Sequence, residues 1–340
     1  MARNVYGLDL GTYEIKVYDK KQNKIWKEKN VIAIKDKRNI FSIGDSAYEM
    51  YEKAPDNIQV VFPMKEGVIS RFDDMQYLLQ NLLSQDRRFA RGSEYLLAVP
   101  TDVTEVEKRA FYDLVVHSTA RARQVQIIER GIADAVGLGL DVQNEKGIFI
   151  ANFGGETTEL SVLASGGMVL NKLVKTGGVQ FDLAVADRVR KNKDFLIGRL
   201  TAEKLRREFG VFDEKNDASL DVAGRNLITG VPQIRTIQIG LVRAAIKEPL
   251  EEIVRSILSM IDRLPPDVRR IINQDGIFIT GGLANLPGLD TYLREVINLR
   301  VRKAKRPDLC AVEGLKKIIL NKELGTLTYS MLDEDYRWLR

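Results

Sequence analysis

Two glycine-rich segments, far apart in the chain, carry the residue types that can cradle a phosphate. Each follows an apolar run and precedes a β-like alternation, so each is predicted to be the turn of a β-hairpin. Successive backbone N–H groups in such a turn converge on one concavity that suits phosphate oxygens. We expect glycine there because the turn needs positive φ and because a phosphate must approach the backbone closely. The residues concerned are Asp9, Gly11 and Thr12 in the first segment and Gly154, Gly155 and Thr157 in the second.

A third glycine pair, Gly281 and Gly282, follows the apolar segment 276–279. Two phosphate-binding turns, with a later glycine turn under the nucleoside, outline a nucleotide cleft between two related domains. A single glycine loop is weak evidence, because such loops bind phosphate in many unrelated folds. The identification therefore depends on the remaining segments of the chain.

The order of the three loops resembles that of the actin, Hsp70 and sugar-kinase superfamily. Further characteristic segments are 63–69, 99–100 with 104–109, 198 with 201–203, 227–232 and 265–267. These segments narrow the resemblance to the MreB family, the bacterial actin homologues that organise cell-wall synthesis. The resemblance extends from about residue 4 to about residue 320, and the matched segments follow in order at matching spacing.

The resemblance implies an α/β fold of the actin type, related to the Hsp70 ATPase domain, with a nucleotide cleft between duplicated domains. Residues 1–144 would form domain I, with a small subdomain within about 32–64. Residues 145–320 would form domain II, with a small subdomain within about 180–238 and the adenosine-side turn at 280–282. A C-terminal extension, 321–340, would pack on domain I or bind a partner.

Hydrophobic periodicity places the elements that must position these loops. Hairpins are predicted over 5–18 and 159–174, and a long amphipathic helix over 240–262. Another helix is expected from Glu105, with Thr104 as its N-cap. Strand, phosphate hairpin, further strands and helices occur twice in this order, which is consistent with a duplicated domain.

Roles in nucleotide binding follow from the resemblance. Asp9 would hold the Mg²⁺ of ATP through water, and one carboxylate suffices because Mg²⁺ keeps several waters. Gly11 and Thr12 would contact phosphate, and Glu203 and Lys204 match the region of the family close to the adenosine. The implied cofactors are ATP and Mg²⁺.

Two positions that bear on catalysis depart from the family pattern. Asn152 stands where the family has an aspartate, and Arg130 stands where a glutamate orients the attacking water. A guanidinium has no acceptor and stays protonated, so it cannot hold a water by accepting its proton. Arg130 could instead pair with a phosphate or with Glu156, and Glu129 could substitute only if its side chain, about 100° away, turned inward. The implied ATPase activity is therefore expected to be weak or absent.

The segment 84–92 falls where the family carries a membrane-inserting loop. It places Phe89 beside Arg87 and Arg88, and an aromatic side chain with a basic rim suits an anionic membrane surface. The alternative is a polar turn with one exposed phenylalanine.

Composition excludes several classes of protein. The 340 residues are 44% hydrophobic and 29% charged, with a net charge of +5, as in an ordinary folded protein. No basic module with interleaved aromatic residues indicates nucleic-acid binding. The single cysteine, Cys310, excludes an internal disulfide and fits a reducing compartment. The chain shows neither a signal-peptide pattern nor an apolar run of the roughly 18 residues that a transmembrane helix needs.

The resemblance thus implies a cell-shape-determining, filament-forming protein that organises peptidoglycan synthesis. We expect it in the cytoplasm at the inner face of the plasma membrane, with its own copies, paralogous MreB-type filaments and membrane proteins of cell-wall elongation as partners. One alternative is a non-hydrolysing scaffold that co-assembles with an orthodox paralogue. A small-molecule kinase of the same superfamily would need an acidic base, which Asn152 and Arg130 do not supply.

Overall fold

The computed structural model describes residues 4–37, 39–85, 92–117, 122–209, 212 and 217–332. By its internal contacts the chain divides into two compact units. Unit 1 comprises 1–150, 161–173 and 309–340, and unit 2 comprises 151–160 and 174–308. The domain boundaries expected at 144 and 320 stay a prediction. The division by contacts is a different one, because it assigns 161–173 and 309–320 to unit 1.

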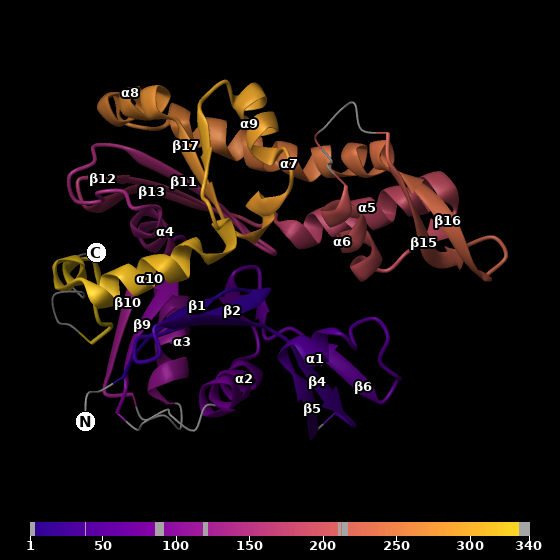
Figure 1. Ribbon diagram of the computed structural model, residues 1–340, viewed down its shortest axis with the longest axis horizontal. Coiled ribbons are helices and arrows are strands. Elements are labelled where there is room, and N and C mark those ends of the chain that lie inside the picture. Colours follow the sequence, from indigo (N-terminus) through magenta and orange to yellow (C-terminus); the bar gives the residue numbers. More distant parts are fainter. Residues whose placement is uncertain are drawn as a thin grey trace. The chain divides into compact units, whose positions relative to one another are not determined.

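Unit 1 is built on a five-stranded sheet with the strand order β10-β9-β1-β2-β3 (Figure 1). The predicted first hairpin is present, because β1 pairs antiparallel with β2, and β1 also pairs parallel with β9. Buried apolar side chains of β1, β2 and β9 form the core together with those of helices α2 and α3. The strands are β1 (Val5–Leu10), β2 (Glu14–Asp19), β3 (Lys24–Lys29), β9 (Glu94–Val99) and β10 (Gln124–Glu129).

Helices pack against this sheet, and the last of them comes from the far end of the chain. Thr104 caps α3 as predicted: its hydroxyl accepts from the Glu107 N–H, and the Glu107 carboxylate accepts from the Thr104 N–H. Helix α10 packs against α4 and also contacts β1 and β2. The helices are α2 (Phe72–Gln85), α3 (Glu105–Val116), α4 (Arg130–Leu138), α10 (Cys310–Leu320) and the 3₁₀ helix η3 (Lys322–Leu327).

A smaller subdomain of unit 1 follows β3. Its three-stranded sheet has the order β5-β4-β6 and carries one short helix. The elements are β4 (Ile32–Lys35), β5 (Asn39–Ile43), α1 (Gly44–Tyr48) and β6 (Ile58–Val61). A separate two-stranded sheet follows, formed by β7 (Met64–Lys65) and β8 (Val68–Ile69).

The second five-stranded sheet has the order β13-β12-β11-β17-β18, and the division between the units runs through β11 and β12. In this sheet β12 and β13 lie side by side, in agreement with the second predicted hairpin, over 159–174. The strands are β11 (Ile148–Phe153), β12 (Thr158–Ala164), β13 (Gly167–Val174), β17 (Ile277–Thr280) and β18 (Val301–Lys303).

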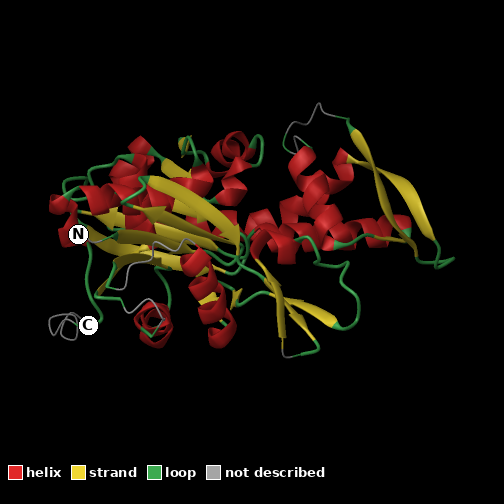
Figure 2. Cartoon of the chain, turned by 60° about the horizontal axis from the view of Figure 1, so that its bottom comes forward, coloured by secondary structure: helices red, strands yellow, loops and turns green. Residues whose placement is uncertain are grey.

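Helices make up most of the rest of unit 2, as the red segments of Figure 2 show. The predicted long helix is α7, which continues through Pro249. The helices are α5 (Gly178–Lys193), α6 (Arg199–Glu208), α7 (Ile239–Asp262), α8 (Pro266–Asp275) and α9 (Leu289–Ile297), with the 3₁₀ helices η1 (Gly282–Asn285) and η2 (Pro307–Leu309).

A three-stranded antiparallel sheet, β14-β15-β16, completes unit 2. Its strands are β14 (Phe195–Leu196), β15 (Ser219–Asn226) and β16 (Pro232–Gln238). Strands β15 and β16 pair along their whole length and form the long two-stranded ribbon of Figure 2.

Candidate functional site

The turn of the first glycine-rich segment is closed by its own backbone. The Gly11 N–H donates to the Glu14 carbonyl at 3.1 Å, and the Gly11 carbonyl accepts from Asn30 Nδ2 at 2.9 Å. Asn30 is fully buried, so its amide fixes the turn from inside the protein. A Cβ on Gly11 would lie 2.7 Å from the Glu14 carbonyl oxygen, closer than real Cβ contacts.

The second turn repeats this geometry at equivalent positions. The Gly154 N–H donates to the Thr157 carbonyl at 2.8 Å, and a Cβ on Gly154 would also lie 2.7 Å from that carbonyl oxygen. Neither Gly11 nor Gly154, both within the described chain, has positive φ. The expectation that these turns need positive φ is therefore wrong; glycine is required because the hairpin backbone approaches within contact distance.

The closing hydrogen bonds change which groups remain for a phosphate. Because the N–H groups of Gly11 and Gly154 are used inside the turns, they are not the donors that a ligand would meet. Among the described residues, the backbone N–H groups of the next positions, Thr12 and Gly155, make no hydrogen bond. These two amides are the donors that the geometry of each turn leaves available to an anion.

Asp9 lies near the end of β1, where two cationic side chains contact its carboxylate. Lys16 stands directly opposite Asp9 in the β1–β2 register, and its Nζ lies 3.4 Å from Asp9 Oδ2. Arg130 is the first residue of α4, and its Nε donates to Asp9 Oδ1 at 3.1 Å. The Arg130 Nη2 also donates to the Leu10 carbonyl at 3.2 Å. Strand pairing and a helix start thus bring together three charges from distant parts of the sequence.

The carboxylate of Asp9 is kept ionised by this arrangement. Burial, the largest single effect, raises the pKa of Asp9, but the charges of Lys16 and Arg130 together outweigh it. The pKa of Asp9 is therefore held below its ordinary value of 3.8. The Asp9 and Arg130 side chains are only 6% and 8% exposed, so water screens the pair weakly.

The two residues of the altered catalytic segment have separate partners. The partners expected for Arg130 from the sequence were a phosphate and Glu156. Its pairing with Asp9 was not expected. The Glu129 carboxylate accepts from the Tyr329 hydroxyl at 2.7 Å and lies 3.7 Å from Lys108 Nζ. Glu129 therefore does not take over the water-orienting position in this structure.

The donor set around Asp9 does not fit a magnesium ion. Mg²⁺ takes oxygen ligands and is repelled by nearby cations. Both oxygens of Asp9 already have a cationic partner within 3.4 Å. Across the residues that the structure describes, no group of three or more His, Cys, Asp or Glu side chains is placed to hold a metal.

In unit 2, the Gly281 turn lies against the end of β11. Its N–H donates to the Pro307 carbonyl at 2.8 Å, and its φ of +84° is one that favours glycine. A Cβ there would lie 2.3 Å from the Phe153 carbonyl oxygen and 2.5 Å from Asn152 Oδ1. The structure thus brings predicted residues Asn152 and Gly281 together, while Gly282 begins η1 with open space around it.

The start of α5 packs on the second turn. The Gly178 and Val179 N–H groups donate to the Gly154 and Gly155 carbonyls at 3.2 and 2.7 Å. Positive charge at a helix N-terminus favours anions, but here its first amides hold the turn itself. The turn is therefore rigidly attached to α5.

The predicted pair Glu203 and Lys204 on α6 is divided between the interior and the surface. Glu203 is buried, and its carboxylate contacts Arg207 at 2.6 Å. Lys204 is exposed and lies 3.8 Å from Glu208. Arg206, two residues after Lys204 on the same helix, donates to Asp182 Oδ1 at 2.6 Å within the interior.

Lys16, Asn30, Asp182 and Arg206 were not predicted as site residues. A signal for Lys16 was present, because a turn over 11–14 places residue 16 opposite residue 9. The Asp182–Arg206 pair joins α5 to α6, and no spacing pattern in the sequence indicates it.

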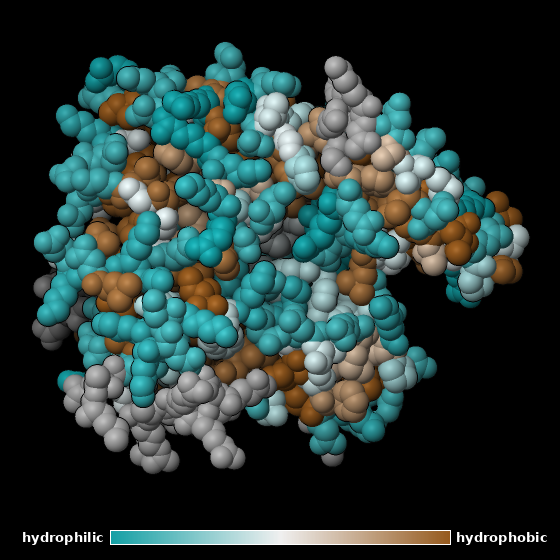
Figure 3. Space-filling model, viewed as in Figure 1, coloured by the Kyte–Doolittle hydropathy of each residue, from teal (hydrophilic) through white to brown (hydrophobic). Residues whose placement is uncertain are grey.

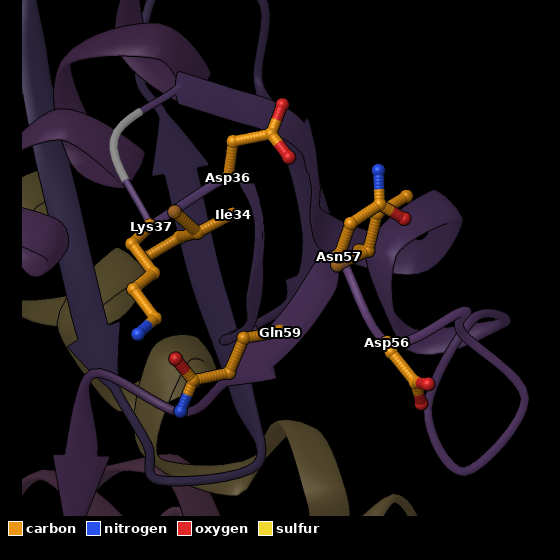
Figure 4. A pocket seen from close by; sticks show the side chains of 7 residues that line it. Ile34, Asp36, Lys37, Asp56, Asn57 and Gln59 are labelled. Atoms are coloured by element: carbon orange, nitrogen blue, oxygen red, sulfur yellow. The ribbon is translucent and has the colours of Figure 1, made fainter.

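One further hollow, of about 510 Å³, lies in the small subdomain of unit 1 (Figure 4). Its lining includes Asp36, Lys37, Asp56, Asn57 and Gln59. The side chains of Asp36 and Asp56 point in different directions in Figure 4, and no predicted site residue lines the hollow. We therefore assign it no role.

The predicted membrane residues Phe89, Arg87 and Arg88 lie outside the described residues. In the part of the chain that the structure describes, every helix is too short or too polar to span a bilayer.

The architecture defines an actin-like protein, and solved structures agree. MreB5 of Spiroplasma citri bound to AMPPNP has a TM-score of 0.90 and 27% identity, over 96% of this chain and 99% of that one. The same protein bound to ADP has a TM-score of 0.89. A MamK double helical filament has a TM-score of 0.79 over 94% of this chain and 99% of that one, and at 17% identity it shows the fold alone.

Sequence comparisons narrow the class. The family described as MreB/Mbl protein matches residues 3–325. The cell shape-determining protein MreB of Escherichia coli (strain K12) is 35% identical over 323 residues, which are 92% of either chain. The chain belongs to the MreB/Mbl family of actin-like, cell shape-determining proteins.

Proposed function

We propose that this chain is a nucleotide-regulated, filament-forming protein of cell shape whose ATP hydrolysis is weak or absent. Nucleotide binding is supported by the two matching turns, each with one unused amide at Thr12 or Gly155, and by the AMPPNP and ADP of the MreB5 structures. Bound nucleotide would shift the population of domain conformations, and thereby polymer stability.

The observation that carries the proposal of weak hydrolysis is the Asp9–Arg130 pair. Arg130 is buried at the start of α4 with its guanidinium on Asp9 and on the Leu10 carbonyl. It offers no acceptor to an attacking water. Loss of a group that positions the nucleophile typically lowers the rate by about 10²–10⁴-fold. The other proposed nucleotide residues are Asp9, Gly11, Gly154, Thr157, Glu203, Lys204, Gly281 and Gly282.

The test is restoration of the acidic groups. We expect steady-state ATP turnover of Arg130→Glu with Asn152→Asp to exceed that of the unaltered chain by at least about tenfold. Arg109→Glu is the matched control: Arg109 also pairs with an aspartate, Asp113, at 2.9 Å, but its side chain is 45% exposed. A double variant that binds ATP, keeps its melting temperature and gains no turnover would contradict the proposal.

We propose self-assembly by head-to-tail contacts, which generate open filaments. The support within this chain is the apolar end of the β15–β16 hairpin, brown in Figure 3. Its exposed apolar residues are Leu227, Ile228, Val231 and Ile234, and exposed Leu196 lies on the adjoining strand β14. A cluster of this kind marks an interaction surface more often than scattered single residues do.

Pelleting measures this surface directly. Ile228 and Ile234 are 79% and 72% exposed, so replacing both with lysine should leave folding intact. We expect the double variant to pellet at least threefold less at equal concentration. Val106→Lys is the control, because Val106 is 80% exposed but stands alone on α3. Equal pelleting of all three chains would remove this hairpin from the assembly contact.

The cellular part of the proposal is a position at the inner face of the plasma membrane, where the filaments organise peptidoglycan synthesis with membrane proteins of cell-wall elongation. It rests on family membership and on the sequence of the segment 84–92. Phe89→Ala should reduce co-sedimentation with anionic vesicles, whereas Arg87→Lys with Arg88→Lys should not. Unchanged sedimentation of Phe89→Ala would discard the membrane segment.

A second candidate is a non-hydrolysing scaffold within the filaments of an orthodox paralogue. The Asp9–Arg130 pair favours it, since a permanently paired site needs no turnover. Co-pelleting with a hydrolysing MreB, without ATP turnover by this chain, would distinguish the scaffold from an autonomous filament.

A further inference from the structure

The first turn is held at both of its ends by one buried residue that lies outside the hairpin. The Asn30 N–H donates to the Tyr13 carbonyl at 3.0 Å, and Asn30 Nδ2 donates to the Gly11 carbonyl at 2.9 Å. Thr12, whose N–H is the donor left available to an anion, stands between these two residues in the sequence. The position of the Thr12 amide is therefore set by Asn30 as well as by the hairpin itself.

The orientation of the Asn30 amide is set by the turn. Asn30 is fully buried, and its Oδ1 has no hydrogen-bond partner among the residues that the structure describes. A buried acceptor without a partner is costly. The opposite orientation would direct Oδ1 at the Gly11 carbonyl, where two acceptors would repel each other. Holding the turn thus takes precedence over satisfying this oxygen.

Asn30 also connects the turn to the small subdomain, which is labelled α1, β4, β5 and β6 in Figure 1. It stands between β3, which ends at Lys29, and β4, which begins at Ile32. The next residue, Val31, is fully buried in the core of the small subdomain. A displacement of that core would therefore displace Asn30, and the turn with it.

The side chain of Tyr13 makes a second connection. Its ring lies edge-to-face with that of Tyr48 on α1, with centroids 5.6 Å apart, and its hydroxyl donates to the Tyr48 hydroxyl at 3.2 Å. Lys29 Nζ lies 4.5 Å from the centre of the Tyr13 ring and 2.5 Å from Glu14 Oε1. The residue that follows Thr12 is thus held by side chains of two other elements.

Tyr48 belongs to the packing of the small subdomain. It stacks on Tyr51 with centroids 6.3 Å apart, and Phe62 meets both rings edge-on. Tyr48 and Phe62 also pack against the buried core of that subdomain. The contact of Tyr13 with Tyr48 therefore joins the turn to the body of the subdomain.

We propose that Tyr13 and Asn30 are positioning residues for the anion-binding amide of Thr12, and that they couple its occupation to the order of the small subdomain. An anion at Thr12 favours the turn conformation that these contacts hold, and such coupling is reciprocal. The ligand class is the polyphosphate of a nucleotide. The proposal rests on the proposed nucleotide binding and adds residues that act through the turn.

The experiment is calorimetric titration of the full chain with ATP in MgCl₂. Tyr13→Ala removes the ring and its contacts with Tyr48 and Lys29, and we expect binding at least tenfold weaker. Tyr13→Phe keeps the ring and loses only the hydroxyl, so its dissociation constant should stay within about threefold of that of the unaltered chain. Phe41→Ala is the control, because it removes a 55% exposed ring from β5 of the same subdomain; it should change nothing.

Two further variants leave Tyr13 in place. Tyr48→Ala alters no residue of the turn, and we expect it to weaken ATP binding by at least threefold. Asn30→Ala removes the hydrogen bond to the Gly11 carbonyl and should weaken binding by at least threefold as well.

Hydrogen exchange measures the coupling in the reverse direction and requires no variant. Saturating ATP should slow amide exchange over 44–62 at least threefold in the unaltered chain. The same ATP saturation should leave exchange over 44–62 unchanged in Tyr13→Ala.

The outcomes separate this inference from the function on which it rests. Binding of ATP by Tyr13→Ala with the affinity of the unaltered chain would overturn the inference and leave nucleotide binding intact. Exchange over 44–62 that ATP does not slow in the unaltered chain, although ATP binds, would overturn it as well. No binding of ATP by the unaltered chain would overturn the proposed nucleotide function, and the inference with it.

Discussion

The two units of this protein each contain a buried arginine–aspartate pair beside a glycine turn, and the pairs differ in their other charged neighbours. In unit 1, Arg130 contacts Asp9, and the cation Lys16 also contacts that carboxylate. In unit 2, Arg206 contacts Asp182, whose carboxylate is also acted on by the anion Glu203 and the cation Arg199. The Nε–Oδ1 distances are 3.1 and 2.6 Å, so the pairs themselves are alike.

Burial and the surrounding charges together decide how each carboxylate titrates. Burial, the largest effect on both, raises the pKa. At Asp9, two cations outweigh burial and the pKa falls below 3.8. At Asp182, Arg206 and Arg199 lower the pKa but do not outweigh burial and the charge of Glu203, and the value reaches about 6. An ion pair seen in a structure therefore does not by itself say whether the protein favours the charged form of the carboxyl group.

The largest effect should come from removing one arginine at a time. Breaking a buried pair by deleting one partner costs about 3–5 kcal/mol. We expect Arg130→Met to lower the free energy of unfolding by this amount near pH 7.5. Arg206→Met should lower it less near pH 5 than near pH 7.5, because Asp182 becomes neutral near pH 5. Urea denaturation followed by circular dichroism at the two pH values measures both losses. A loss of Arg206→Met that is the same at pH 5 and pH 7.5 would contradict the assigned pKa.

The pH dependence of stability should have opposite signs at the two carboxylates. Asp182 has a higher pKa folded than unfolded, so its stabilising protonation is present below about pH 4 and is lost as pH rises to about 6. Asp9 has a lower pKa folded, so its contribution is present above about pH 4 and is lost on acidification below that value. The Asp182 effect is at most about 3 kcal/mol.

Asn variants isolate these two contributions. As the pH rises from 4 to 6.5, the unaltered chain should lose stability relative to Asp182→Asn. As the pH falls below 4, it should lose stability relative to Asp9→Asn. Denaturation midpoints measured across this range check the signs, and parallel curves for all three chains would show that neither carboxylate is shifted.

Alanine at each turn tests whether the two hairpins are equivalent in backbone geometry. Gly11→Ala and Gly154→Ala both place a Cβ 2.7 Å from a backbone oxygen, so each should lose about 1–3 kcal/mol, equal within about 1 kcal/mol. Melting temperatures of the two variants provide the measurement. A loss confined to one variant would show that the turns differ more than their hydrogen bonds suggest.

The smallest effect concerns the residue beside Arg130. Tyr329→Phe removes the hydroxyl that donates to Glu129 at 2.7 Å, and we expect a loss of about 1 kcal/mol. ATP turnover should stay unchanged, because Glu129 does not serve the first turn. A rise in turnover would show that the released Glu129 can orient water, which would move the catalytic role one residue along the chain.

Much of the fold was predictable because its signals are local. The hairpins, the Thr104 capping box and helix α7 follow from alternation, cap chemistry and helical periodicity, and the family followed from ordered motifs. The expectations missed β15, α8 and α10. The polar strand β15 has a solvent-exposed face, and nothing in the residues of α10 indicates that it packs beside α4.

The candidate site was predicted in its residues more than in its contacts. Asn152 and Arg130 were recognised as altered positions from the sequence. Their neighbours were not, because Asp9 and Arg130 are 121 residues apart and only the tertiary structure brings them together. Glycine was rightly predicted at positions 11 and 154, but the reason given, a positive φ, was wrong. The reason is the close approach of the backbone where each hairpin closes.

Helix α10 has a consequence for how the protein is made. It packs so closely on α4 that a Cβ on Gly314 would lie 1.8 Å from the Ala133 carbonyl oxygen, and it belongs to unit 1. Unit 1 therefore remains incomplete while the ribosome synthesises residues 174–308 of unit 2. At elongation rates of about 5–20 residues per second, this interval is roughly 7–27 s. A nascent chain thus cannot present a finished unit 1 until α10 has been synthesised.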